Sequence, residues 1–408
     1  MIKPESIQII KTTLPVLQQH GEDLTRLFYQ RMFENNPEVK PYFNQAHQQV
    51  GSQQRALASA ICAYAQHIDN PQALAGAVEL IAQKHASLGI KAEHYPIVGA
   101  NLLASIRELL GDAATEDIIE AWGEAYMALA DIFINREKAI YEHHEEQYGW
   151  QGFKPFVVVK REFNSDNISS FYLQPQDGEK LPPHKPGQYI TVRVPAAEGR
   201  HTMRNYSLSN EPGSATYRIS VKRELPSPAD SPAGVVSNFL HEHIQQGDLI
   251  EIAPPCGDFT LKTPENDTTA QVFIAGGVGI TPLLSMLHDA LDKADGKRRI
   301  ILIQAAINGD VHAFEDEIAR LADKHINMQW HVRYSEPTAA DHAANRYDSE
   351  GLLDANLVET LIGEQDADYY LCGPKAMLKH TYQLLQQHQT PASSIHYELF
   401  GPADQLHG

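Results

Sequence analysis

The spacing of apolar positions changes twice along this chain and divides it into three regions. In the first region apolar side chains recur at steps of three and four residues, for example from Val78 through Ile81 to His85, and from Tyr126 to Glu137. This is the period of an amphipathic helix. Prolines stand where helices are expected to begin, a position that tolerates a missing N–H: Pro4, Pro71 and Pro96. Residues 1–147 are therefore predicted to form an all-α domain.

The second region, residues 153–264, has short runs rich in β-branched and aromatic residues. Such runs occupy 156–159, 188–194 and 217–222, and turn pairs such as Pro186-Gly187 separate them. Short strands punctuated by turns are typical of antiparallel sheets. We expect an antiparallel β-barrel of about six strands.

The third region, residues 268–408, alternates apolar runs with helical stretches. The predicted strands are 272–275, 300–303, 328–332 and 368–371. Alternation of strand and helix is typical of a parallel sheet with helices on both faces. The chain is thus expected to be multidomain, with an all-α, an antiparallel β-barrel and an α/β region.

Composition excludes several classes of partner and membrane protein. The net charge of −19 over 408 residues argues against nucleic acid and anionic lipid surfaces. No apolar run approaches the roughly 20 residues that span a bilayer, and the first residues lack the apolar core of a signal peptide. Three distant cysteines suit reduced thiols. We expect a cytoplasmic, monomeric protein without an integral membrane segment.

A glycine-rich turn in the third region can bind a nucleotide. It follows a predicted strand, precedes a helix, and consists of Gly277, Val278, Gly279, Ile280, Thr281 and Pro282. Glycines let a backbone approach a pyrophosphate, and a helix N-terminus offers free N–H groups; a tight structural turn is the alternative. A second motif ends a later strand and would lie at the same sheet edge: Cys372, Gly373 and Pro374. Cys372 is otherwise simply a small buried residue.

The barrel region carries residues that suit a flavin. In the run Arg204–Ser207 the guanidinium can hold a diphosphate, and the Tyr206 ring can cover the isoalloxazine. An ordinary strand with a surface arginine is the alternative. Farther along, Gly234–Leu240 is predicted to be a helix begun by Ser237, whose N-terminus can bind phosphate.

In this order, these motifs resemble the ferredoxin–NADP reductase family, in which an FAD barrel precedes a nicotinamide domain. The resemblance implies an FAD site made of Tyr189, Arg204, Asn205, Tyr206 and Ser207, and a nicotinamide site at Gly277–Pro282. In that family an aromatic residue at the end of the C-terminal strand approaches the flavin ring. The matching stretch here is Glu398, Leu399, Phe400, Gly401 and Pro402, and Phe400 takes the aromatic position. Many relatives have cysteine in place of Leu399, so contacts from that residue stay open.

The helical region offers one histidine in a setting that suits iron. His85 lies near the end of an apolar helix expected over 74–86. Gln53 is the first residue of the apolar face of another helix, expected over 53–67. Tyr29 lies near Phe33, with Phe43 farther on. A tyrosine hydroxyl and a single amide above an apolar face can reach a gas ligand. The alternatives are a solvated or core histidine and an ordinary core tyrosine.

Three strings resemble the globin domain of the flavohaemoglobins, namely Phe28–Phe33, Ala82–His85 and Phe133–Glu137. Together with the reductase motifs, the resemblance covers essentially the whole chain. It implies haem b with His85 as the iron ligand, and Lys84, beside it, is counted with the cofactor-binding residues. It further implies a gas side formed by Tyr29, Gln53 and Leu57, a porphyrin contact from Phe43, and a hydrogen-bond network of His85 with Tyr95 and Glu137.

That network has a physical rationale. A neutral imidazole that binds iron through one nitrogen must place its other N–H on a partner. A buried carboxylate such as Glu137 would accept that proton and make the imidazole more electron-rich. The change favours oxygen activation over reversible carriage. A plain ion-pairing carboxylate is the alternative for Glu137.

The resemblance implies a nitric oxide dioxygenase, which converts NO and O2 to nitrate with electrons passed from NAD(P)H through FAD to haem. NADH is favoured over NADPH, because the stretch Gln304–Asp310 after the second strand holds no cation for an extra phosphate. Two other functions stay open: a gas sensor or oxygen store, and a flavin reductase acting on quinones, ferric chelates or peroxides.

Overall fold

The computed structural model describes residues 2–43, 52–196, 200–226, 232–263, 268–294, 296–363 and 365–401, with side chains in the helix after residue 51 described from Leu57 onward. Contacts gather in two units, one of residues 1–153 together with 193–203, and one that holds most of the remaining residues. No helix among these residues is long and apolar enough to cross a membrane.

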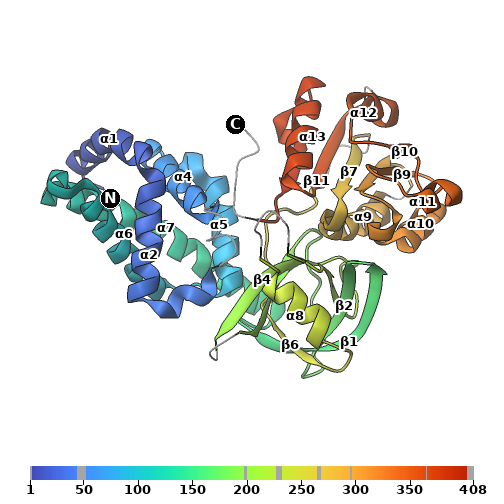
Figure 1. Cartoon of the computed structure of the whole chain (residues 1–408), viewed down its shortest axis with the longest axis horizontal. Coiled ribbons are helices and arrows are strands. Elements are labelled where there is room, and N and C mark those ends of the chain that lie inside the picture. Colours follow the sequence, from blue (N-terminus) through green and yellow to red (C-terminus); the bar gives the residue numbers. More distant parts are fainter. Residues whose placement is uncertain are drawn as a thin grey trace. The chain divides into compact units, whose positions relative to one another are not determined.

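The first unit is helical, as the apolar period predicts (Figure 1). Helix α1 begins at a proline, and Thr115 caps α7 by accepting a hydrogen bond from the Ile118 N–H. The α-helices are α1 (Pro4–Gln19), α2 (Gly21–Asn35), α4 (Ser52–Gln66), α5 (Ala75–Leu88), α6 (Tyr95–Leu110) and α7 (Glu116–Tyr148). Short 3-10 turns lie at η1 (Pro37–Tyr42), η2 (Pro71–Leu74), η3 (Ala92–His94) and η4 (Gly111–Ala113).

The apolar stripes of these helices face one another. On α7, Ala130 and Phe133 are buried against Ala82 and Ala86 of α5. A larger cluster joins α1, α2, α4, α6 and the start of α7, where the Trp122 indole donates to Thr13 Oγ1 at 3.0 Å. The apolar contacts between α5 and α7 fix the distance between these two helices. The polar side chains on their facing stripes are therefore brought into contact.

The second unit begins with an antiparallel sheet in the order β4-β3-β6-β1-β2-β5. Its strands are β1 (Lys154–Ser165), β2 (Ile168–Pro175), β3 (Tyr189–Pro195), β4 (His201–Ser207), β5 (Tyr217–Lys222) and β6 (Leu249–Ile252), and helix α8 (Val235–His243) lies between the last two. The chain beyond β4 closes the sheet: Leu208 forms a bridge with Ile219 of β5, and the Ser209 N–H donates to the Arg218 carbonyl at 2.8 Å. The six-stranded barrel expected from the turn pattern is confirmed.

The rest of the unit is a parallel sheet in the order β10-β9-β8-β7-β11-β12. Its strands are β7 (Ala270–Gly276), β8 (Ile300–Ala306), β9 (Met328–Tyr334), β10 (Ser349–Glu350), β11 (Ala367–Cys372) and β12 (Ile395–Glu398). The helices are α9 (Ile280–Ala294), α10 (Glu315–Lys324), α11 (Ala339–Ala344), α12 (Ala355–Ile362) and α13 (Lys375–Gln387), with 3-10 turns η6 (Gly277–Gly279), η7 (Gly309–Val311) and η8 (Ala392–Ser394).

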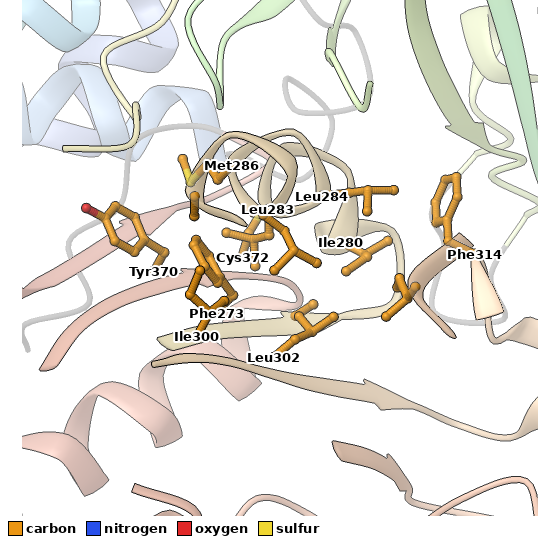
Figure 2. Packing of buried hydrophobic residues seen from close by; sticks show 14 of the residues in the cluster. Phe273, Ile280, Leu283, Leu284, Met286, Ile300, Leu302, Phe314, Tyr370 and Cys372 are labelled. Atoms are coloured by element: carbon orange, nitrogen blue, oxygen red, sulfur yellow. The ribbon is translucent and has the colours of Figure 1, made fainter. Parts of the chain in front are cut away.

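Helices cover both faces of this sheet (Figure 1). On one face, α9 and α10 pack on Phe273 and Leu302. Figure 2 shows the α9 part of this packing from close by. On the other face, α12 and α13 pack on Val272 and Ile274. Every residue of β7 is buried, which explains why its sequence is a continuous apolar run and not an alternating one.

Strand order reverses between β7 and β11. From β7 the chain runs outward through β8 and β9, then returns to place β11 on the other side of β7. Ligands of open parallel sheets bind beyond the carboxyl ends of strands at such a reversal. The two motifs noted in the sequence, Gly277–Pro282 and Cys372–Pro374, follow these two strands and therefore lie at the same edge.

Candidate functional site

His85 is presented by the last turn of α5. The helix ends at Gly89, whose φ of 80° suits a residue without a side chain, and the Ile90 N–H donates to the His85 carbonyl at 3.0 Å. The imidazole lies with its centre 5.6 Å from the Phe133 ring of α7. The helix end and this ring contact together fix the direction of the imidazole.

One nitrogen of His85 belongs to a buried hydrogen-bond network. Nδ1 lies 2.8 Å from Glu137 Oε1 and 3.2 Å from the Tyr95 hydroxyl, and that hydroxyl donates to the same Oε1 at 2.5 Å. The Glu137 side chain is only 2 % exposed. Since a carboxylate can only accept, Nδ1 carries the imidazole proton and donates it to Glu137. The Nε2 lone pair is then available for a metal.

The remaining nitrogen of His85 faces a setting that fits haem. The His85 side chain is 33 % exposed, beside the partly buried apolar residues Val78 and Ile81, and Nε2 has no hydrogen-bond partner among the described residues. The same ranges contain no cluster of three or more His, Cys, Asp or Glu side chains that could hold a metal ion. A single imidazole beside apolar surface suits an iron held mainly by a macrocycle.

The period of α7 could have revealed a further member of this network. The Tyr126 hydroxyl donates to the Tyr95 carbonyl at 2.6 Å and so fixes the start of α6. Tyr126 lies on the same stripe as Glu137, so its inward direction was predictable, although its partner was not. Burial, together with the neighbouring Glu137 carboxylate, raises the pKa of the Tyr95 hydroxyl, which therefore stays protonated as a donor.

Tyr29 lies in an aromatic cluster of the same unit. Its ring centre is 5.7 Å from that of Phe33 and 5.6 Å from that of Phe43, and the residue is 5 % exposed. Burial raises the pKa of its hydroxyl, and no hydrogen bond joins that hydroxyl to another described residue. A tyrosine hydroxyl in such an aromatic cluster is suited to donate to a ligand.

The other predicted haem contacts have different surroundings. Leu57 and Phe43 are partly buried in the cluster that contains Tyr29, whereas Lys84 is exposed on α5. The Gln53 side chain lies outside the described residues, although its backbone belongs to α4. The structure therefore brings Tyr29, Phe43 and Leu57 into one cluster. The role of the Gln53 amide stays a prediction.

The predicted FAD residues lie along β3 and β4. The Asn205 amide oxygen accepts from Thr191 Oγ1 at 2.8 Å, which ties the two strands together. Tyr189 and Ser207 are buried. The pKa of the Arg204 guanidinium is lowered by burial, and burial raises the pKa of the Tyr206 hydroxyl. Arg204 keeps its charge because an arginine does not deprotonate in proteins, so a diphosphate would meet a desolvated cation.

The prediction that Ser237 begins a helix is wrong. Helix α8 begins two residues earlier, at Val235, and its N-cap is Gly234. The Ser237 hydroxyl donates to the Gly234 carbonyl at 3.2 Å and lies 3.3 Å from the Glu224 N–H, from which it accepts. The Ser237 hydroxyl therefore lies inside the first turn of α8, where its hydrogen bonds to backbone groups stabilise that turn. A phosphate role for the helix start stays a proposal.

The glycine-rich turn owes part of its composition to packing. A Cβ on Gly279 would lie 2.2 Å from the Cys372 carbonyl oxygen, and a Cβ on Gly276 would lie 2.5 Å from the Met377 sulfur. Gly277 differs: its φ is 52°, and a Cβ there would meet nothing within 4 Å. Close contact with the Cys372–Pro374 turn explains Gly279, and the left-handed backbone explains Gly277.

The rest of the turn is buried at the head of α9. Ile280, Thr281 and Pro282 are inside the fold, and the Thr281 hydroxyl donates to the Val278 carbonyl at 3.0 Å. Val278 is partly buried against the sheet core. The backbone of this turn, more than its side chains, therefore faces the open edge where N–H groups can meet a phosphate.

The C-terminal strand lies next to Cys372. Glu398 of β12 pairs with Cys372 of β11, and burial, with the nearby Glu398 carboxylate, raises the pKa of the thiol. Cys372 is therefore a neutral buried thiol and not a nucleophile. Leu399 is partly buried on the core, Phe400 is 50 % exposed, and the Gly401 N–H donates to the Leu399 carbonyl at 3.0 Å. Pro402 lies outside the described residues.

The stretch Gln304–Asp310 has no cation of its own, but Arg346 lies beside it in the structure. Gly309 follows β8 in turn η7, and a Cβ on it would lie 3.4 Å from an Arg346 nitrogen. Arg346 comes from the segment between α11 and β10, some forty positions later. A cation therefore reaches this loop from elsewhere in the chain, although the loop itself contributes only the acidic Asp310.

Three family models match the chain in the order that the fold shows. They are Globin over residues 26–133, Oxidoreductase FAD-binding domain over 155–261 and Oxidoreductase NAD-binding domain over 273–383. The chain is 48 % identical over 407 residues to a flavohemoprotein of Halalkalibacterium halodurans, covering 99 % of this chain and 98 % of that one.

Solved structures agree with these matches. A flavohemoglobin from Malassezia yamatoensis with bound FAD and heme superposes with a TM-score of 0.85 at 27 % identity, covering 98 % of this chain and 100 % of that one. The FAD/NAD-binding domain of a nitric oxide dioxygenase from Vibrio cholerae gives 0.54 at 32 % identity, covering 61 % of this chain and 99 % of that one. Full-length identity, domain order and fold together show that this chain belongs to the flavohemoprotein family, the flavohaemoglobins that its motifs resemble.

Proposed function

We propose that this protein is an NAD(P)H-dependent nitric oxide dioxygenase that converts NO and O2 to nitrate. The observation that carries the proposal is the contact between His85 Nδ1 and the buried Glu137 carboxylate at 2.8 Å. A histidine so partnered is a stronger electron donor than one bonded to a backbone carbonyl. The V. cholerae protein, whose reductase portion is similar, carries the same activity in its name.

Bound haem would supply an iron that takes up a gas, and bound FAD would carry electrons from a nicotinamide to that iron. His85 Nε2 would hold the iron, while Glu137 and Tyr95 keep the proton on Nδ1. The Tyr29 hydroxyl would donate a hydrogen bond to developing negative charge on the gas, in surroundings from which water is largely excluded. Leu57 and Phe43 would keep that side apolar, which suits a small apolar substrate.

The reductase residues would bind and orient the two nucleotides. Arg204 would neutralise the FAD diphosphate, and Tyr206 and Ser207 would hold the flavin against β4. The N–H groups at the head of α9 would hold the nicotinamide dinucleotide phosphate groups. Phe400, half exposed after β12, would cover the flavin ring.

The test is a single-turnover reaction. The protein is loaded with haem and FAD, reduced anaerobically with NADH, and mixed with oxygenated buffer and NO. One nitrate per NO consumed is expected. With excess NADH, an oxygen store would stop after at most one nitrate per haem, and a flavin reductase with accessory haem would keep its activity in His85→Ala. Either result would overturn the proposal.

The nicotinamide preference is settled by comparing KM for NADH and NADPH. We expect NADH to be preferred, because Asp310 lies on the same loop that Arg346 approaches and opposes an added phosphate. An equal or lower KM for NADPH would refute this preference without affecting the nitrate test.

A further inference from the structure

We propose that Arg218, Glu317 and His288 are positioning residues that hold the nicotinamide turn at a fixed distance from the flavin-binding strand. The inference rests on the proposed placement of FAD at β4 and of the nicotinamide dinucleotide at the turn before α9. None of the three residues was a candidate in the sequence, because they come from three elements far apart in the chain.

Arg218 is anchored on the barrel side. It lies on β5, is 5 % exposed, and its Nε donates to Ser209 Oγ at 3.0 Å, with a second hydrogen bond from the guanidinium to the Ser209 carbonyl. Ser209 follows β4 by two residues and also contacts Ser220 Oγ at 2.8 Å. The guanidinium is therefore bound to the continuation of the strand that carries Arg204–Ser207.

The same guanidinium reaches the parallel-sheet domain. Its two terminal nitrogens donate to Glu317 Oε2 at 2.7 Å and Oε1 at 3.1 Å, a two-pronged pair that fixes direction as well as distance. The Phe314 ring, at the start of α10, lies 5.3 Å from the guanidinium carbon. Both charged residues line a cleft between the barrel and α10, so the pair bridges this boundary beside the apolar contacts that Ile168 and Phe259 make with the α9 core.

His288 extends the chain of contacts to α9. Its Nε2 lies 2.8 Å from Glu317 Oε1. Burial disfavours a charged Glu317, but the hydrogen bonds from His288 and Arg218 outweigh it and lower the pKa of that carboxyl to about 2. Glu317 is thus ionised at neutral pH and accepts from both partners.

Helix α9 carries this restraint to the nicotinamide turn. His288 stands eight residues after Ile280, where α9 begins directly beyond turn η6. A helix moves as a rigid rod, so a shift at His288 displaces Gly277–Gly279 relative to β4. Transfer between two bound groups is sensitive to such shifts, since an error of about 1 Å can cost on the order of a hundredfold in rate.

The test measures the rate at which NADH reduces the flavin in three variants of the full, haem- and FAD-loaded protein. Glu317→Gln keeps the shape but removes the charge, and His288→Asn removes only the outer contact. Glu315→Gln is the matched control: it makes the same change in the same helix at a residue without an ion pair among the described residues. Flavin content and reduction by dithionite are recorded for each.

We expect Glu317→Gln to lower the limiting rate at saturating NADH by roughly ten- to a hundredfold, His288→Asn by less, and Glu315→Gln not at all, with FAD content and dithionite reduction unchanged. A purely structural role would reduce the amount of bound flavin but not the rate of the flavin that remains. A wild-type rate per bound flavin in Glu317→Gln would overturn the inference, even if that variant lost FAD. Failure of the wild type to form nitrate would refute the proposed function instead, because flavin reduction is measured without NO.

Discussion

The Glu137 carboxylate accepts the His85 Nδ1 proton and the Tyr95 hydroxyl proton on the same oxygen, at 2.8 and 2.5 Å. Two donors on one buried oxygen fix the direction of both hydrogen bonds and leave no freedom in the imidazole tautomer. Glu137 lies 52 positions from His85, on another helix. The pair exists only because α5 and α7 pack with these stripes face to face.

Replacing Glu137 by Gln should therefore impair turnover more than folding. The amide can still accept from Tyr95, but it is neutral and therefore a weaker acceptor for the imidazole N–H. The imidazole then becomes less electron-rich. We expect NO consumption to fall by roughly ten- to a hundredfold, the usual range for a hydrogen-bond partner of a metal ligand, with haem still bound. Steady-state NO consumption and the haem absorption spectrum are the measurements.

Glu145→Gln is the matched control for that change. It lies on the same helix, at an exposed position, and should leave turnover unaltered. Equal turnover in Glu137→Gln and wild type would show that the carboxylate is only a structural ion partner.

Tyr29→Phe tests the gas side. Tyr29 is buried and its hydroxyl has no acceptor among the described residues, so removal of the hydroxyl should cost little stability. Turnover should fall at least tenfold if the hydroxyl stabilises charge as oxyanion-type donors do. Rapid-mixing NO consumption and thermal unfolding are measured together.

Tyr64→Phe provides the comparison, because Tyr64 is equally buried in the same cluster, at 5 % exposure. It should keep full turnover. A change in oxygen release without loss of nitrate formation in Tyr29→Phe would favour an oxygen store.

The fold was largely predictable because local periods determine it. Steps of three and four on α5 and α7, short strands between turns, and a buried run before a glycine turn each follow from local burial. The position of Gly277–Gly279 between β7 and α9 was predicted for the same reason. The stripes also predicted that His85 and Glu137 face inward.

The contacts between distant residues were not predictable. Arg218 and Glu317 are 99 positions apart, and neither stands in a motif, so no local pattern pairs them. Arg346 reaches Gly309 only through the fold of the segment after α11. Ser237 was misplaced because a serine is common both at a helix start and in the first turn, where it bonds to local backbone.

Gly279→Ala should disrupt the nicotinamide turn. The added carbon would lie 2.2 Å from the Cys372 carbonyl oxygen, and a backbone atom in a buried sheet cannot move aside. Overpacking of this kind costs about 1–3 kcal/mol. We expect a lower unfolding temperature and a higher NADH concentration for half-maximal flavin reduction.

Gly276→Ala serves as its graded comparison. The nearest atom there is the flexible Met377 sulfur, at 2.5 Å, which can rotate away, and the nearest rigid atom is the Pro374 Cδ, at 2.9 Å. The clash with fixed atoms is thus milder than at Gly279, and the loss should be smaller. A larger effect in Gly276→Ala than in Gly279→Ala would contradict the packing explanation for Gly279.

Stability of the second unit should decline as pH falls from about 6.5 to about 4. Burial lowers the pKa of His184, His312 and His396 from 6.5 to about 4. All three are neutral in the folded protein in this window, whereas the unfolded chain takes up the protons, so unfolding gains protons and the folded state is progressively disfavoured. For the two most buried groups, His184 and His312, each full shift corresponds to roughly 3 kcal/mol.

The measurement is urea unfolding of the holoprotein at pH 7.5, 6.0 and 5.0, followed by flavin fluorescence. His184→Asn removes one of these groups while an amide can still bond to Ser285, whose hydroxyl lies 3.0 Å from the imidazole. The loss of stability between pH 6.5 and 5 should then be smaller than that of the wild type, whereas His388→Asn, at an exposed position at the end of α13, should keep the full pH dependence. If His184→Asn retained it too, protonation elsewhere in the unit would have to account for the acid sensitivity, since burial of this imidazole would then contribute nothing to the pH slope.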